Sequence, residues 1–312
     1  MDSSRIQAPP SAEQLATHVR SALAEHYARP IVDARVDGTV AVVAGRAIDR
    51  ARAAVEAAWG ADEVARIVEL DVVALPWHAV AAAGLRLWRQ HGRSGSDGEI
   101  VTELEAGDPP FQVVTTDDGW QLVRLADGAQ GWIEAQDHAP AAAPTDTLSD
   151  ASRVDVEAFL EQLLSFEGVP YVWGGTTNAG VDCSGIVQRA AWRAGGCWLP
   201  RHSKALLTSG RRVAPSAIER GDVLVLKRDP KTQDAEQRAQ LAALAEAEAR
   251  TGIVPPHGPA IHPLHVAVAL SADEAIHASR DTMRVAREPL ESLRARYRVL
   301  GVRRLGPPEE PA

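Results

Sequence analysis

The sequence is poor in cysteine, with only two in 312 residues. Two cysteines cannot build a disulfide framework, which argues against a small disulfide-stabilised secreted protein. The chain also lacks the run of ~20 apolar residues that a membrane helix needs, and its start, MDSSRIQAPP, lacks the basic-then-apolar pattern of a secretion signal. We therefore expect a soluble, cytoplasmic protein with no integral membrane segment, with signal-independent export as the alternative.

Basic residues are outnumbered by acidic ones, and Phe and Tyr are rare. The 33 basic and 42 acidic side chains give a net charge of −9, which argues against nucleic-acid binding. Phe and Tyr number three each, against eight Trp. Residues 75–148 contain four of these Trp and carry 11 acidic but only 4 basic side chains. The negative charge is therefore concentrated in a middle segment.

The N-terminal part predicts an αββαβ module over residues 11–74. SAEQ at 11–14 has the form of a capping box before a helix over about 12–27. Asp37-Gly38 lies between two β-like runs and predicts a hairpin, followed by an amphipathic helix that ends at Gly60 and a strand, VARIVELDVVAL. The pattern resembles the small BON-type domain, and that resemblance implies weak association with the cell envelope. A purely structural module is the alternative.

Short β-like runs separated by Gly and Asp predict a small barrel over residues 76–137. Its Gly119-Trp120 and Gly131-Trp132 pairs make it resemble a bacterial SH3-like domain. We expect most of the Trp in this segment to be core residues. Residues 138–150, rich in Pro, Ala and Thr, are predicted to be a linker.

Cys183 begins a predicted helix in VDCSGIVQRAAWRAGG, which Gly195-Gly196 ends. Unpaired N–H groups at a helix start favour an anion, so this position is expected to favour a nucleophilic thiolate. Cys197 lies beyond the far end of the helix, at ~20 Å by the helical rise, and is therefore too distant for a disulfide. We expect Cys197 to be a small buried apolar residue.

Two histidines could supply the base that a cysteine nucleophile needs. HVAVAL and AIHAS are interpreted as a hairpin in which His265 pairs with Ser279 and His277 with Ala267. Both histidines then lie on one face as diagonal neighbours, and the even-numbered residues form the opposite, aliphatic face. The alanines beside the histidines are expected to leave room for the helix of Cys183. A lone histidine would more often be a satisfied core residue, but a pair on one face favours a base and the group that orients it.

The motifs PYVWGG, DCSG, LPR-x-S, RGDVLVL, HVAVAL and AIHAS resemble, in this order, the NlpC-type cysteine peptidases, a papain-like group of cell-wall enzymes. The resemblance covers about residues 152–304, so we assign 151–305 to a catalytic domain. The expected fold class is α+β: a papain-like NlpC-type domain preceded by the αββαβ module and the SH3-like barrel.

The resemblance implies a role for each matching residue. Cys183 would be the nucleophile, His265 the base and His277 the orienting third member. Tyr171 would help to stabilise the oxyanion together with the backbone N–H of Cys183. Substrate binding would fall to Asp182 and Ser184, where the family holds the free amino end of a short peptide, and to Arg201, which would buttress that pocket or form a surface ion pair.

The family hydrolyses the γ-D-glutamyl–diamino acid bond of peptidoglycan stem peptides or muropeptides, so this reaction is the expected function, without a cofactor. The acidic middle segment suits recognition of a free N-terminal L-Ala. The alternatives are an amidase or acyltransferase with the same catalytic group, or a non-catalytic envelope-binding adaptor.

One segment departs from the family pattern, an insertion over about residues 228–262. It contains QDAEQRAQLAALAEAEAR, a strong helix former, which is interpreted as a solvated surface helix, with a lid over the cleft as the alternative. His257 and His262 lie nearby without a Cys or carboxylate at ligand spacing, so no metal site is expected.

Overall fold

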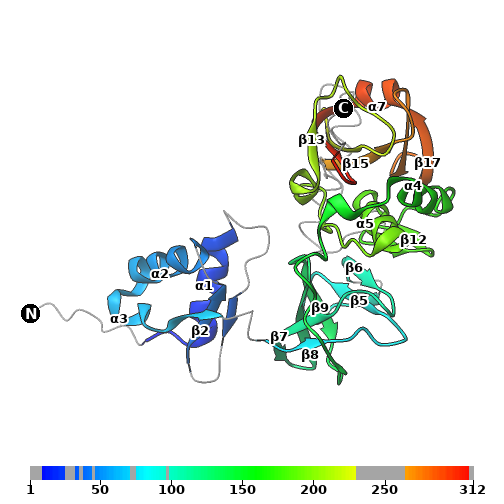
Figure 1. Ribbon diagram of the computed structural model, residues 1–312. Helices are drawn as coiled ribbons and strands as arrows, with labels where there is room; N and C mark the ends of the chain where they lie inside the picture. The colour runs from blue at the N-terminus through cyan, green and yellow to red at the C-terminus, as the bar shows by residue number, and fades with distance from the viewer. Residues whose placement is uncertain are drawn as a thin grey trace, which may run out of the picture. The chain divides into compact units, whose positions relative to one another are not determined.

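The computed structural model describes residues 9–24, 32–34, 38–43, 46–70, 75–95, 98–229 and 264–308. The chain divides into two compact units, Met1–Leu75 and Pro76–Ala312. Figure 1 shows the elements of both units. The predicted insertion falls almost entirely outside the described residues, so the structure does not test its helix.

The first unit packs two helices on a small sheet. Its elements are α1 (Ala12–Ala24), β1 (Val32–Ala34), β2 (Val40–Val43), α2 (Arg46–Trp59), α3 (Ala61–Val64) and β3 (Ile67–Leu70). The predicted capping box is confirmed, because the Gln14 N–H donates to Ser11 Oγ and the Ser11 N–H to Gln14 Oε1. β2 pairs antiparallel with β1 and parallel with β3. The resemblance to BON-type domains stays a prediction.

An antiparallel sheet begins the second unit. Its strands are β4 (Trp77–His78), β5 (Leu85–Trp88), β6 (Ile100–Leu104), β7 (Phe111–Asp117), β8 (Trp120–Leu125), β9 (Gln130–Glu134) and β10 (Pro140–Ala141), in the order β10-β4-β7-β8-β9-β5-β6. Of the four Trp, Trp88 is buried at 7% exposure, whereas the other three are half-buried. The expectation that most of them are core is wrong, because the three half-buried Trp lie outside the apolar cluster of this sheet.

The segment over residues 138–150, predicted as a linker, is tied to both of its neighbours. β10 pairs with β4, and the carbonyl of Leu148 accepts a hydrogen bond from the Trp198 N–H. The barrel segment and the C-terminal domain consequently belong to the same compact unit.

The C-terminal domain is built on an antiparallel six-stranded sheet. Its order is β13-β18-β14-β15-β16-β17. The strands are β13 (Arg211–Val213), β14 (Val223–Arg228), β15 (Leu264–Ala269), β16 (Glu274–Ser279), β17 (Arg284–Pro289) and β18 (Tyr297–Arg304). Two further short strands, β11 (Thr176–Thr177) and β12 (Gly180–Val181), pair in the loop before the helix of Cys183.

Helices cover both faces of this sheet. α4 (Val156–Ser165) and α5 (Cys183–Gly195) share one apolar cluster with Val266, Val268 and Ile276. α7 (Leu290–Arg296) packs into a second cluster with the alternate residues of β14, β15 and β16. Two short 3-10 helices, Ala151–Arg153 and Ala205–Thr208, complete the domain. Helices beside antiparallel sheets confirm a mixed fold of α and β elements.

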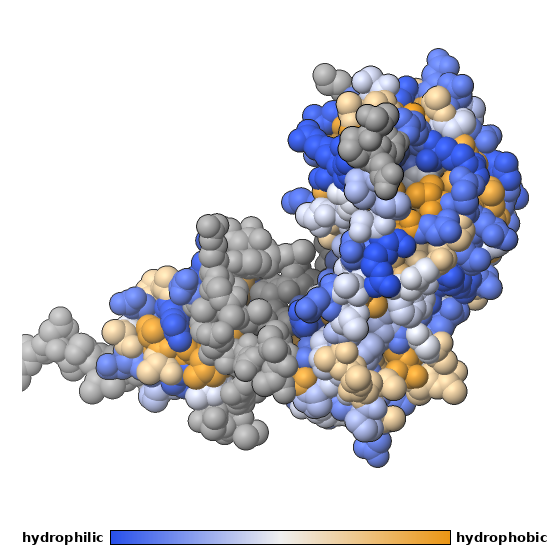
Figure 2. Space-filling view, viewed as in Figure 1, coloured by the Kyte–Doolittle hydropathy of each residue, from blue (hydrophilic) through white to orange (hydrophobic). Residues whose placement is uncertain are grey.

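Hydrophilic residues dominate the face of this unit that Figure 2 shows, and apolar residues form small separate patches. In the described part of the chain, no helix has both the length and the apolar character to span a membrane.

Candidate active site

Cys183 is the first residue of α5, and Asp182 is the N-cap of that helix. The Asp182 carboxylate accepts hydrogen bonds from the N–H groups of Ser184, at 3.1 Å, and Gly185, at 2.7 Å. An Asp at this position satisfies N–H groups that the helix itself cannot pair. At Gly185 a Cβ would lie 2.2 Å from the carbonyl oxygen of Gly175. DCSG therefore holds Cys183 at a helix start packed closely against the preceding loop.

Arg201 neutralises the Asp182 carboxylate. Its Nη1 and Nη2 donate to the two Asp182 oxygens at 3.0 and 2.6 Å, and Nη1 also donates to Ser184 Oγ at 3.0 Å. Burial opposes ionisation of Asp182, but the guanidinium and the backbone N–H groups outweigh it and lower the pKa of the carboxyl. With an exposed fraction of 3%, Arg201 forms a buried ion pair with Asp182, so the alternative of a surface ion pair is wrong, and the role in buttressing a substrate pocket stays a prediction.

The Cys183 side chain is buried, with 4% exposure. Burial raises the pKa of the thiol to about 12, and the charge of Asp182 adds to the rise. The backbone N–H of Val266 and the hydroxyl of Ser203 hydrogen-bond the sulfur and oppose this rise without cancelling it. The expectation that this position favours a thiolate is therefore wrong, because burial outweighs the hydrogen bonds to the sulfur. A base must remove the proton.

The two histidines meet across the predicted hairpin. β15 and β16 pair Val268 with Ile276 and Ala269 with Ala275, the register predicted from the sequence. His265 Nε2 lies 2.7 Å from His277 Nδ1, and both side chains are buried. Burial lowers the pKa of His277, although the nearby Glu288 carboxylate opposes this effect. The structure thus joins the two rings by a hydrogen bond.

The helix of Cys183 packs on the opposite face from the one expected. Val266 and Val268, on the aliphatic face, contact the apolar cluster that includes Cys183. Ala267 and Ala269, on the histidine face, pack in the cluster that includes α7. The larger aliphatic side chains bury more area against α5, which explains this choice of face. The nucleophile reaches the sheet through the backbone N–H of Val266, the residue after His265.

Tyr171 supplies a polar group inside this site. Its ring is 3% exposed, and its hydroxyl is a buried oxygen with no hydrogen-bond partner within the described structure. Burial raises the pKa of this phenol, and the neighbouring Cys183 and Asp182 raise it further, so the group stays a neutral O–H donor. Its backbone N–H donates to the Met283 carbonyl, which fixes the loop against the β16–β17 turn.

The SH3-like segment reaches the same region through Asp127. Asp127 Oδ2 accepts hydrogen bonds from Gln188 Nε2 at 2.9 Å and from the Arg201 backbone N–H at 2.8 Å, and Oδ1 accepts one from the Ala129 N–H. Burial raises the pKa of this carboxyl despite these hydrogen bonds. Asp127 carried no assigned role in the sequence, because it contacts the C-terminal domain more than sixty residues away and no local motif marks it.

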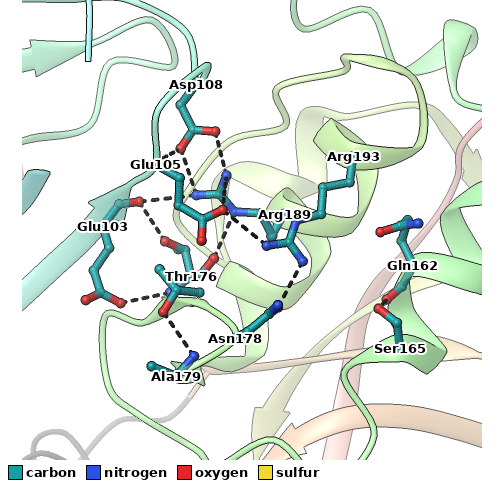
Figure 3. A network of polar contacts seen from close by, with 11 residues as sticks. Glu103, Glu105, Asp108, Gln162, Ser165, Thr176, Asn178, Ala179, Arg189 and Arg193 are labelled. Atoms are coloured by element: carbon teal, nitrogen blue, oxygen red, sulfur yellow. Dashed lines mark hydrogen bonds and ion pairs between the residues drawn. The ribbon is translucent and has the colours of Figure 1, made fainter. Parts of the chain in front are cut away.

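Two other acidic residues of this segment, Asp108 and Glu105, form ion pairs with the C-terminal domain. Arg189, on α5, donates from Nη1 and Nη2 to the Asp108 carboxylate at 2.5 and 2.8 Å. Figure 3 shows this pair beside Glu105, Arg193 and the loop of Thr176. Two of the carboxylates predicted to attract a substrate amine, Glu105 and Asp108, are thus already paired with arginines of the C-terminal domain.

Three further residues of the site carried no assigned role in the sequence. Ser203 lies in LPR-x-S, a quoted motif, so its proximity to Cys183 could have been anticipated. Glu288 and Arg296 lie beside His277: the pairing of β16 with β17 brings Glu288 there, and Arg296, the last residue of α7, donates to Glu288. No group of three or more His, Cys, Asp or Glu in the described ranges is arranged to hold a metal ion.

A buried cysteine at a helix start, a hydrogen-bonded histidine pair on neighbouring strands and a buried tyrosine hydroxyl form the residue set of a cysteine hydrolase. Comparison with known families agrees: the model of the NlpC/P60 family matches residues 168–304, and that of the bacterial SH3 domain matches residues 93–137. The chain therefore contains an NlpC/P60 domain and a bacterial SH3 domain, which confirms both resemblances.

The chain is similar to three bacterial relatives over short segments. It is 39% identical over 85 residues to a gamma-DL-glutamyl hydrolase of Bacillus subtilis, covering 27% of this chain and 20% of the relative. It is 41% identical over 80 residues to a probable endopeptidase of Mycobacterium tuberculosis, covering 26% of this chain and 20% of the relative. It is 36% identical over 75 residues to the murein DD-endopeptidase MepS/murein LD-carboxypeptidase of Escherichia coli, covering 24% and 40%.

The matched segments thus span between a fifth and two fifths of these relatives. A crystal structure of an NlpC/P60 family protein from Bacillus cereus matches 76% of this chain and 65% of its own, with 20% sequence identity and a TM-score of 0.37. A TM-score of this size adds nothing to the family match.

Proposed function

We propose that this protein is a cysteine endopeptidase that hydrolyses the γ-D-glutamyl–diamino acid bond of peptidoglycan stem peptides or muropeptides. The observation that carries the proposal is the placement of Cys183 at the start of α5, hydrogen-bonded to the residue that follows His265, with His277 2.7 Å from His265. The name of the B. subtilis relative supports γ-glutamyl specificity.

The proposed reaction begins with proton transfer from Cys183. His265 uses Nε2 for His277, so Nδ1 is the nitrogen that would take the thiol proton. The sulfur attacks the γ-carbonyl carbon, and the carbonyl oxygen gains the negative charge. The Tyr171 hydroxyl and the Cys183 N–H would stabilise that oxyanion. His265 then protonates the leaving amine, and water, activated by the same nitrogen, hydrolyses the thioester and restores the thiol.

Substitution of the nucleophile tests this assignment. Cys183→Ala is expected to lower kcat by at least ~10⁴-fold on L-Ala-γ-D-Glu-diaminopimelate, because removal of a nucleophile has effects of this size or larger in comparable enzymes. Cys197→Ala is the matched control: Cys197 is also buried, but within the described residues its thiol donates to the carbonyl of Asp150, away from both histidines. Mass spectrometry of the products should show L-Ala-D-Glu and the free diamino acid. Turnover retained by Cys183→Ala would refute the proposal.

The free amino end of the substrate remains part of the proposal. Asp127 and Asp182 lie on either side of Arg201, but Asp182 is already bound to that guanidinium, whereas the three hydrogen bonds to Asp127 come from neutral N–H groups. A peptide amine would suit Asp127 better, because a cation offsets the burial of its carboxylate. N-acetylation of the L-Ala should abolish cleavage, and equal rates for free and acetylated peptides would overturn this preference.

The same experiments distinguish the alternatives. An amidase or acyltransferase would release different products from the same site, which mass spectrometry would reveal. A non-catalytic envelope-binding adaptor would bind peptidoglycan fragments without turnover in the wild-type protein. Cytoplasmic action on recycled muropeptides, with weak envelope association through residues 11–74, is also a proposal, and cell fractionation checks it.

A further inference from the structure

The hydrogen-bonded histidine pair continues to a carboxylate on the next strand. His277 Nε2 lies 3.0 Å from Glu288 Oε2, and Arg296 Nη2 donates to that same oxygen at 2.7 Å. β16 and β17 pair Ala275 with Glu288, so Glu288 is a diagonal neighbour of His277 on the same face of the sheet. His265, His277, Glu288 and Arg296 thus form one continuous line of polar contacts.

Charged and polar groups enclose this line. Arg296 also lies 3.6 Å from the Asp281 carboxylate, and Asp281 accepts a hydrogen bond from Arg228 at 3.0 Å. Arg228 in turn donates to the Tyr297 hydroxyl at 2.8 Å, and the Tyr297 ring stacks on His265 with centroids 5.2 Å apart. The contacts close a ring from one histidine back to the other, and two arginines balance its two carboxylates.

The carboxylate imposes a direction on the hydrogen bonds. A carboxylate such as that of Glu288, which accepts from Arg296, can only accept hydrogen bonds, so His277 must present its Nε2–H to it. In a neutral imidazole the other nitrogen, Nδ1, is then an acceptor. His265 must consequently donate from Nε2, and its own neutral ring keeps a lone pair on Nδ1. The opposite direction would place a hydrogen on His265 Nδ1, which then could not take the Cys183 proton.

We propose that Glu288 is a positioning residue that sets the tautomers of His277 and His265 and thereby makes His265 Nδ1 the base of the site. The catalytic consequence rests on the proposed function, whereas the tautomers themselves do not. Arg296 supports the arrangement by donating to the Glu288 carboxylate and thereby fixing its orientation.

The first test reads the tautomers directly. In ¹⁵N-labelled full-length protein at neutral pH, long-range ¹H–¹⁵N correlation spectra should show both His265 and His277 with the hydrogen on Nε2. A wild-type His277 protonated on Nδ1 instead would overturn the proposal without the need for any variant.

The second test uses Glu288→Gln to reverse the donor–acceptor direction of the hydrogen bonds along the two histidines. Arg296 would still donate to the amide oxygen, which turns the amide NH₂ toward His277 and requires an acceptor at Nε2. Both histidines should switch to the Nδ1–H tautomer. The value of kcat should then fall by ~10²-fold or more, with KM within about twofold; a comparable tautomer error next to the catalytic histidine of a serine protease costs ~10⁴-fold. Unchanged tautomers or unchanged kcat in a folded Glu288→Gln protein would overturn the proposal.

Two variants separate positioning from a general structural effect. Glu288→Asp keeps the carboxylate and should restore the Nε2–H tautomers and most of kcat. Glu167→Gln removes a charge of the same sign from a pair with Arg287, the strand neighbour of Glu288, and should change neither the tautomers nor kcat. If the wild-type protein cleaves no stem peptide but its tautomers switch as described, the proposed function fails and the positioning role stands.

Discussion

Replacement of Arg189 by Met probes the junction between the SH3-like segment and the C-terminal domain. Arg189 is 1% exposed and holds Asp108 through two hydrogen bonds, of 2.5 and 2.8 Å. Its Nε also donates to the Thr176 carbonyl at 2.8 Å, and its guanidinium lies 5.7 Å from the Trp198 ring centroid. Met preserves the length and apolar stem of the side chain but leaves the Asp108 carboxylate buried without its cation.

The expected loss in the free energy of unfolding follows from that unpaired charge. Breaking a buried ion pair by removal of one partner costs ~3–5 kcal/mol. Arg193→Met is a matched control one helical turn later on α5, because the Arg193–Glu105 pair is partly exposed. Such a pair contributes ~0.2–1 kcal/mol, and the position of Arg193 over the Phe166 ring adds ~0.5–1 kcal/mol. The two variants should therefore differ by at least ~1 kcal/mol.

Urea unfolding of the full chain, followed by tryptophan fluorescence, measures this difference. Trp59 lies in the first unit and the other seven Trp in the second, so the signal mainly reports the unit that contains the junction. A double variant, Arg189→Met with Asp108→Leu, should recover most of the loss, since an apolar pair of similar volume can replace a buried ion pair. Equal losses for Arg189→Met and Arg193→Met would refute the reasoning.

Two further predictions concern the site itself. Gly185→Ala places a Cβ 2.2 Å from the Gly175 carbonyl oxygen and should lower the free energy of unfolding by ~1–3 kcal/mol. Gly195→Ala is the control and should not lower it, because its Cβ comes no nearer than 3.9 Å to another group. Equal urea midpoints for the two variants would contradict this prediction. Burial lowers the pKa of His277, so the contribution of its neutral ring to the free energy of unfolding is present above the ordinary His pKa of ~6.5. This contribution is lost as the pH falls below that value, by at most ~1.4 kcal/mol per pH unit. In urea unfolding between pH 7.5 and 5, His277→Asn should flatten the pH dependence of stability, and an unchanged slope would count against this reasoning.

Short sequence patterns predicted two features of the site, the end of α5 and the register of β15 and β16. The helix that starts at Cys183 ends with Gly196 in the left-handed conformation at φ 73°, as the Gly pair indicated. Alternation of apolar residues predicted the register of β15 and β16, because a shift by one residue would move every side chain to the other face. The meeting of His265 and His277 follows directly from that register.

Long-range packing decided what the sequence could not predict. Periodicity shows that His265 and Val266 lie on opposite faces of a strand, but it does not say which face receives α5. The thiol pKa depends on how deeply Cys183 is buried, and burial is a property of the whole domain. Glu288 enters the histidine line only through the pairing of β16 with β17, a contact that no motif in the chain marks.

The acidic middle segment shows why net charge alone does not identify a ligand. Its excess of carboxylates is compatible both with a cationic substrate and with a cationic domain surface, and composition does not distinguish the two. Asp108 and Glu105 contact Arg189 and Arg193 of α5, so these charges stabilise domain packing instead of attracting a peptide. Asp127 differs because it accepts from neutral N–H groups beside Arg201. Any preference for a substrate amine should therefore depend on this one carboxylate, and also on the buried ion pairs that hold its domain in place.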